Sequence, residues 1–188
     1  SVVYAALVAA LMAWTIWSAL LCIGNDWQWG HNGYNGAAFW NAARNSVRFG
    51  MVGQAQYHTG LLPPPVADIY THHPMLLHAH LVLSYVVLGD APWVGRLWPA
   101  LYSIGVVGML LVVLRRVLPR WPALLAATLY ALTPLPIVFA NMIDHEQGCL
   151  FWLLVLLWSW HRFVREGGRR RDLLAMLLAV SMAAQFDW

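Results

Sequence analysis

The sequence contains little charge and no lysine. Of its 188 residues 10% are charged, and every fixed positive side chain is an arginine. Typical soluble domains are about 25% charged, so this chain lacks the charged shell that a soluble domain of its size needs. Because 61% of the residues are apolar, the composition indicates a protein whose solvent is the lipid bilayer.

A continuous basic face and a metal-ligand pattern are also missing. The net charge is only +3, and the arginines gather at the ends of apolar runs, so nucleic acid is not an expected partner. The two cysteines, Cys22 and Cys149, lack metal-ligand spacing. We interpret them as apolar residues, with a disulfide as the alternative. His78 and His80 are two residues apart and diverge on a helix, so we predict no metal site.

Apolar runs near the length of a membrane-spanning helix recur along the chain. They predict an all-α fold, a polytopic transmembrane helix bundle. The chain begins without methionine inside one run and stops inside another, so we expect the N-terminal portion of a single, longer transmembrane domain over residues 1–188. The predicted spans are residues 1–23, 93–114, 121–142, 149–164 and 173–188.

The arginines predict the orientation of these spans. Eight of the eleven lie in the loops after the second and fourth spans, and such loops are cytoplasmic by the positive-inside rule. Residues 24–92 and 141–148 then lie outside, with seven of the eight histidines. The eight arginines are Arg115, Arg116, Arg120, Arg162, Arg165, Arg169, Arg170 and Arg171.

Two short helices are predicted in the first outer loop, over residues 36–49 and 75–88. The first carries a polar stripe of Asn41, Arg44, Asn45 and Arg48 beside an apolar one, which is typical of a helix lying in the membrane interface. Its arginines face either lipid headgroups or a substrate phosphate, which a guanidinium binds bidentately. The second run is too short to span and contains histidines, so we expect it at the outer interface.

Polar residues around these helices are candidates for the chemistry. A glycine-rich turn over residues 30–36 would let backbone approach a ligand, with Asn35 capping the following helix and Gly50 ending it. His72 and His73 precede the second helix and are candidates for substrate contacts. Asp144 and Glu146 follow a span interrupted by Pro134 and Pro136. Such a broken helix is tolerated mainly beside a cavity or neighbouring helix, and its acids suggest a cleft.

Several segments together resemble the GT-C membrane glycosyltransferases. The resemblance is to the family 39, dolichyl-phosphate-mannose–protein mannosyltransferase-like proteins, and more distantly to aminoarabinose lipid A transferases. Asp187-Trp188 adds a further similar feature at the end. The segments are GHNGYNGAAFWNAARNSVRFG (30–50), YTHHPMLL (70–77), GDAPWVGRLWPALYSIG (89–105), LRRVLPRWPALLAATLYALTP (114–134) and the turn of Asp144 and Glu146.

The resemblance implies an enzyme, a hexosyl or pentosyl transferase. It implies a polyprenyl-phosphate sugar donor and inverting transfer to a protein, lipid or cell-envelope glycan acceptor. The reaction would take place on the outer face of a membrane, here a bacterial inner membrane. No cofactor is implied, and assistance by a divalent metal stays open. Later spans would complete the fold, so we expect this chain to be inactive alone.

The expected base is an acid in the outer loops. Relatives often carry an acid where this chain has Asn32, and an amide is not a base. Asp26, just beyond the first span, or Glu146 would then take the proton of the acceptor hydroxyl, while an arginine stabilises the leaving phosphate. The substrate-binding candidates are His31, Asn32, Asn35, Arg44, Arg48, His72, His73 and Asp144. The alternative function is a non-catalytic membrane subunit or a transporter component.

Overall fold

The computed structural model describes residues 1–28, 30–51 and 53–187. Trp188, the last residue of the predicted fifth span, lies outside them. Within these ranges every regular element is helical, so the predicted all-α class is confirmed there. The elements are α1 (Val2–Leu20), α2 (His31–Phe49), the 3-10 turn η1 (Val66–Asp68), α3 (Leu76–Leu88), α4 (Pro92–Val117), α5 (Arg120–Leu132), α6 (Pro134–Val138), α7 (Glu146–Arg165) and α8 (Arg170–Phe186).

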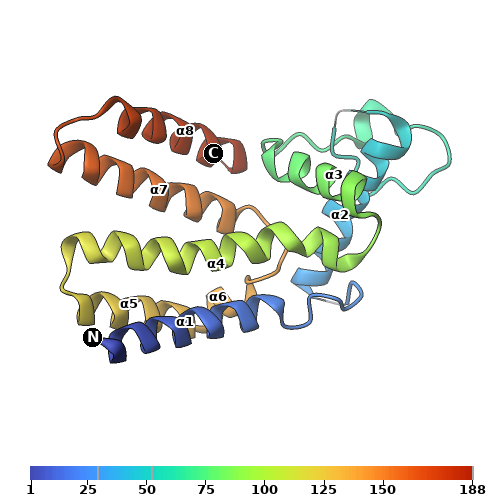
Figure 1. Cartoon of the computed structure of the whole chain (residues 1–188). Helices are drawn as coiled ribbons and strands as arrows, with labels where there is room; N and C mark the ends of the chain where they lie inside the picture. Colours follow the sequence, from blue (N-terminus) through green and yellow to red (C-terminus); the bar gives the residue numbers. More distant parts are fainter. Residues whose placement is uncertain (29, 52, 188) are drawn as a thin grey trace.

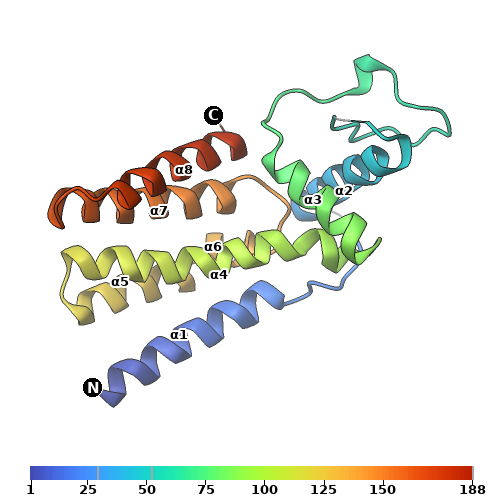
Figure 2. The same ribbon diagram turned by 45° about the horizontal axis from the view of Figure 1, so that its top comes forward.

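The helices α1, α4, α5, α7 and α8 lie side by side and form a bundle (Figure 1). Helix α4 contacts α1, α5 and α7, and α8 packs on α7. Helices α2 and α3 gather at one end of this bundle, where α3 also contacts α4 and α8 (Figure 2). The segment predicted as the first outer loop therefore caps one end of the molecule.

Two of the described helices, α1 and α4, are long and apolar enough to cross a bilayer. The predicted third span is divided, because Pro134 disfavours helical backbone at the preceding Thr133, which is extended. Pro134 then occupies the first turn of α6, where its missing N–H costs nothing. The break makes a short irregular passage between α5 and α7 at the end where α2 and α3 lie.

Helix α2 begins earlier than the sequence suggested. We expected a turn over residues 30–36, but the structure starts the helix at His31 after Gly30, whose φ of +105° favours glycine. Asn35 therefore lies inside the helix, so its predicted role as a cap was wrong. The predicted end is confirmed, since Gly50 takes a left-handed conformation with φ of +62°.

The predicted polar stripe of α2 holds the loop that follows it. The amide Nδ2 of Asn41 donates to the carbonyls of Gln56 and His58, each at 3.0 Å. Asn45 Nδ2 donates to Ala55 and His58, each at 2.8 Å. A buried loop needs partners for its carbonyls, so these asparagines stabilise the loop and are not free to bind a ligand.

The arginine-rich loops lie at the opposite end of the bundle from α2 and α3 (Figure 1). Arg116 pairs with Glu166 at 3.1 Å. Arg162 lies 3.5 Å from Glu166 and 3.2 Å from Asp172. These ion pairs join the ends of α4 and α7 and the start of α8. Because eight of the eleven arginines lie in these loops, this end of the bundle holds most of the fixed positive charge.

Candidate active site

The segment before α2 packs tightly against that helix. A β-carbon at Gly33 would overlap the backbone carbonyl of Gln28, and one at Gly36 would overlap the ring of Trp27. Only glycine permits this approach at these two positions. The glycines that suggested a ligand-binding turn therefore serve helix packing, and they fix residues 27–28 against the first turns of α2.

The start of α2 also reaches the turn before α7. Asn35 Nδ2 donates to Asp144 Oδ2 at 2.7 Å, although the two residues are 109 positions apart. His31 Nε2 lies 3.9 Å from the same oxygen. Asp144 Oδ1 accepts the backbone N–H of His145 at 2.9 Å. The Asp144 carboxylate is thus oriented by α2 on one side and by its own turn on the other.

A pair of stacked histidines lies beside this carboxylate. The rings of His73 and His145 are 4.3 Å apart at an angle of 24°. His73 Nδ1 is 3.3 Å from Asp187 Oδ1, and Tyr70 packs on His73 at 5.8 Å. His145 is buried, and burial together with the neighbouring His73 lowers its pKa, so its ring is neutral at pH 7. The segment before α3, the turn before α7 and the end of α8 meet here.

Glu146, the first residue of α7, has an unusual acidity. The residue is exposed overall, yet partial desolvation of its carboxyl group raises its pKa to about 7. The nearby negative charges of Asp144 and Asp187 act in the same direction. A carboxyl group with a pKa near the working pH is suited to accept a proton from a hydroxyl.

Asp26 lies in a neighbouring polar pocket. Its lining includes Arg96, Asn32 and Asn141. Arg96 is 5% exposed, donates to the carbonyls of Ile23 at 3.0 Å and Asn25, and has its guanidinium 4.2 Å above the ring of Trp27.

Arg96 is the functional candidate that the sequence reasoning missed. It lies early in α4, one of the two helices among the described residues that are long and apolar enough to span a membrane. A lone arginine in such a helix is expensive, and it marks a functional site by default. That signal was available from the sequence alone, whereas the burial of Arg96 and its contact with the Trp27 ring were not.

The two acidic centres are neighbours at the same end of the bundle. Asn32 lines the Asp26 pocket and Asn35 binds Asp144, and residues three apart on a helix have β-carbons about 5–6 Å apart. Asn141, also in the Asp26 pocket, precedes Asp144 by three residues and donates to the carbonyl of Leu21 at 2.7 Å. Asn32 Oδ1 is buried with no partner in the described structure, which leaves an acceptor for a ligand.

Arg44 and Arg48, the arginines predicted to hold a phosphate, contact other side chains of the protein instead. Arg44 makes two hydrogen bonds to Asp90, at 2.9 and 2.8 Å, and Trp40 Nε1 donates to the same carboxylate. Arg48 lies 5.0 Å from the ring of Phe49. Among the described contacts neither arginine meets the acids of the site. Arg44 stabilises the junction between α2 and α4 instead.

His72 lies at an open cleft of about 600 Å³ beside the site. Tyr57, Asp68 and Tyr70 also line it. Tyr57 Oη lies 2.8 Å from Tyr34 Oη, and this hydrogen bond with partial burial raises the pKa of Tyr57 to about 12. The cleft therefore presents neutral hydroxyls and aromatic rings, next to His73.

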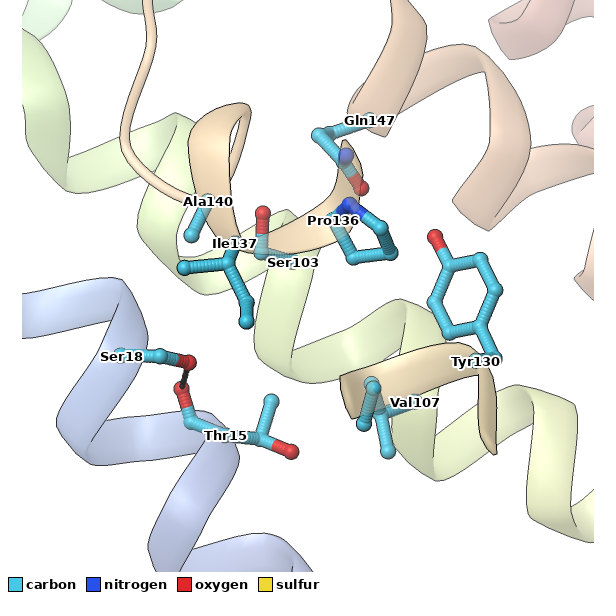
Figure 3. Close-up of a pocket in the computed structure, with 10 residues that line it drawn as sticks. Thr15, Ser18, Ser103, Val107, Tyr130, Pro136, Ile137, Ala140 and Gln147 are labelled. Carbon is cyan, nitrogen blue, oxygen red and sulfur yellow. Dashed lines mark hydrogen bonds between the residues drawn. The ribbon is translucent and has the colours of Figure 1, made fainter. Parts of the chain in front are cut away.

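A smaller cavity lies inside the bundle, next to the start of α7 (Figure 3). Thr15 and Ser18 of α1, Ser103 of α4 and Gln147 of α7 border it, with Tyr130 of α5. It leaves about 10 Å³ for the centres of water molecules, which is room for about one. A sugar does not fit, so this cavity is not the substrate site.

The histidines, cysteines and acids are dispersed over the part of the chain that the structure describes. Those residues contain no group of three or more histidine, cysteine or acidic side chains that could hold an ion. His78 is instead a core residue bonded to Ser46 Oγ at 2.9 Å, and His80 packs 4.4 Å from the ring of Trp98. Both cysteines are free thiols.

Comparison with known proteins identifies a family. A sequence profile of the family described as dolichyl-phosphate-mannose-protein mannosyltransferase matches residues 72–186, more than half of the chain. The matched region includes Arg96 and the acidic turn before α7, whereas Asp26 and α2 precede it. No curated protein and no solved structure matches the chain.

Proposed function

Since the chain belongs to the dolichyl-phosphate-mannose-protein mannosyltransferase family, we propose that it moves a sugar from a polyprenyl-phosphate donor to an acceptor on the extracytoplasmic face. Family membership makes it a membrane glycosyltransferase of the GT-C type with a lipid-linked sugar donor. The polyprenyl carrier, the sidedness, and a bacterial inner membrane as its location are our proposals. The transferred sugar is a hexose or pentose, and the acceptor a protein, lipid or envelope glycan.

One observation carries the proposal. Asn35, from the first outer segment, binds Asp144, from the turn before α7, and this contact fixes one acid beside a second at the polar end of the bundle. The second acid, Glu146, has a pKa raised to about 7 by partial desolvation and by its acidic neighbours. As the anomeric carbon becomes cationic, the acceptor hydroxyl loses its proton, and a positioned carboxylate accelerates that transfer.

We assign the base to Glu146 and an orienting role to Asp144. Asp144 is 15% exposed and already accepts two hydrogen bonds, which hold its carboxylate in place. Asp26 faces Arg96 in the adjacent pocket. There it is the second candidate for the base.

The leaving phosphate needs a cation. Arg96 lines the same pocket as Asp26, whereas Arg44 is bound to Asp90. A guanidinium in a partly dry pocket stabilises developing phosphate charge more strongly than one in water. Asn32, with its free carbonyl oxygen, lies beside it and can accept a sugar hydroxyl.

The membrane arrangement follows from the charges. We propose that the bundle is polytopic, with α1 and α4 crossing fully and α5 to α8 completing further passages. The arginine-rich end then faces the cytoplasm and the acid-rich end faces outward. The donor phosphate would reach Arg96 from the outer leaflet, and the acceptor would enter along the cleft of Tyr57, Tyr70 and His72.

Donor choice provides the test. The protein, reconstituted in vesicles with a cell-envelope extract as acceptor, is given radiolabelled polyprenyl-phosphate mannose or GDP-mannose. We expect label in the acceptor fraction only from the lipid-linked donor, and a loss of at least tenfold in Arg96→Gln. Transfer from GDP-mannose, or full transfer by Arg96→Gln, would contradict the proposed donor and its phosphate site.

A further inference from the structure

An apolar groove with two unpaired arginines at its end runs along the opposite half of the molecule. It lies between α1 and α5 and has a volume of about 480 Å³. Its walls are almost wholly apolar; the residues are Leu7, Ala10, Leu11, Trp14, Trp121, Leu124, Leu125, Thr128 and Leu132. The sugar-transfer site uses none of these residues.

The arginine end of the groove is built from aromatic rings and guanidinium groups. Tyr4 packs edge-on against Trp121 with ring centroids 5.6 Å apart. The Arg120 guanidinium lies 5.4 Å from the Trp121 ring and 5.9 Å from the Tyr4 ring. Arg115 approaches the same Tyr4 ring at 6.0 Å. Both cations therefore stand where the groove begins.

These two arginines have no acidic partner in the described structure, whereas the neighbouring Arg116 pairs with Glu166. The side chains of Arg115 and Arg120 are exposed, and the single hydrogen bond that Arg115 donates, to the carbonyl of Leu118, is long at 3.5 Å. Positive charge without a protein counterion at the mouth of an apolar groove is complementary to an anionic amphiphile.

The length of the groove fits one acyl chain. Its α5 wall runs from Trp121 to Leu132, which is about 17 Å at the rise of an α-helix. The hydrocarbon half of a bilayer is about 15 Å thick. At the far end Trp14 Nε1 donates to the carbonyl of Ala131 at 3.2 Å and ties the two helices together. We propose that this groove is a binding site for an anionic glycerophospholipid, with its phosphate at Arg115 and Arg120 and one acyl chain along α1 and α5.

This lipid site does not depend on sugar transfer. It lies at the arginine end, away from Asp144 and Arg96, and a phospholipid there would be structural. A polyprenyl phosphate has a phosphate and an apolar chain too, but its reacting phosphate belongs at the acidic end. Lipid binding and donor turnover can therefore succeed or fail separately.

Native mass spectrometry tests the site. The protein is reconstituted in vesicles of phosphatidylcholine and phosphatidylglycerol at equal amounts, extracted in mild detergent, and its retained lipids are counted. We expect preferential retention of one phosphatidylglycerol. Each of Arg115→Gln and Arg120→Gln should weaken retention about fivefold, since a basic residue near an anionic lipid contributes about that factor.

Matched variants separate the groove from general charge. Thr128→Phe fills the groove and should abolish retention, while Leu129→Phe, on the exposed neighbouring face of α5, should not. Arg165→Gln removes an exposed arginine at the same end and should leave retention unchanged. Equal retention of both lipids, equal effects of Arg120→Gln and Arg165→Gln, or displacement of phosphatidylglycerol by equimolar polyprenyl phosphate would each overturn the proposal.

Discussion

At the arginine end of the bundle the ion pair between Arg116 and Glu166 lies at the surface, whereas at the acidic end Asp144 is mostly buried and held by a side chain of α2. Arg116 and Glu166 are 38% and 34% exposed, so water screens their pair and its contribution is small. Asp144 is 15% exposed and is bound by Asn35. This difference fits our proposal that the first end sets the orientation in the membrane and the second performs the chemistry.

The largest predicted effect is a difference in sugar transfer between the removal of two carboxylates, one at each end of the bundle. Glu146→Gln removes the proposed base and should lower the rate of sugar transfer by about 100-fold or more, since general bases contribute about 10²–10⁴. The control Glu166→Gln removes a carboxylate at the arginine end and should keep transfer within about twofold. Asp26→Asn tests Asp26 as the alternative base. Loss of sugar transfer in Asp26→Asn, together with full transfer in Glu146→Gln, would assign the base to Asp26.

The pH dependence sharpens the same contrast. Glu146 must lose its proton to act, so transfer should fall about tenfold per pH unit below a pH of about 7 and level off above it. The folded state raises the pKa of Glu146 above its ordinary 4.5, so it binds this proton more tightly than the unfolded chain. Stability therefore decreases as pH rises from about 4.5 to about 7. A flat rate profile between pH 5 and 8 would argue against Glu146.

Packing at the acidic end should tolerate little change. Gly33→Ala places a β-carbon on the Gln28 carbonyl, and it should lower the free energy of unfolding by about 1–3 kcal/mol, as overpacking does. The rate of sugar transfer should also fall, because the substitution displaces the Asp26 pocket that Gly33 lines. Gly24→Ala, which meets no atom within 4 Å, is the control. Thermal unfolding in detergent measures both, and equal melting temperatures would show that residues 27–28 do not rest on α2 as described.

The smallest effect belongs to the surface pair. Arg116→Gln breaks the contact with Glu166 and should lower the free energy of unfolding by less than about 1 kcal/mol, because both partners face water. Denaturant unfolding measures the difference. A loss as large as that of Gly33→Ala would remove the contrast between the ends.

Much of the fold was predictable because its causes are local. The all-α class follows from apolar runs, the end of α2 at Gly50 from glycine, and α3 over Leu76–Leu88 from a run predicted at residues 75–88. The resemblance to the mannosyltransferase family is confirmed by the match over residues 72–186. Apart from the family resemblance, which draws on several segments, each of these signals lies within a short stretch of sequence.

The rest depended on partners that sequence order does not reveal. Arg44 looked free to bind phosphate, but Asp90, 46 residues away, occupies it. Gly33 and Gly36 looked like part of a turn, but they lie in the first turns of α2, where Gln28 and Trp27 pack on them. Asn35 looked like a helix cap, yet it holds an acid 109 positions later. The roles of Asp26 and Glu146 stay predictions.

The central claim is that the acidic end carries the chemistry outside the cell while the arginine end stays inside. Single cysteines at Tyr57→Cys and Arg165→Cys, in a chain with Cys22→Ser and Cys149→Ser, test it with a membrane-impermeant maleimide. Intact cells should label only Tyr57→Cys, and Arg165→Cys should react only after permeabilisation. Labelling of Arg165→Cys in intact cells with Tyr57→Cys protected would contradict the account.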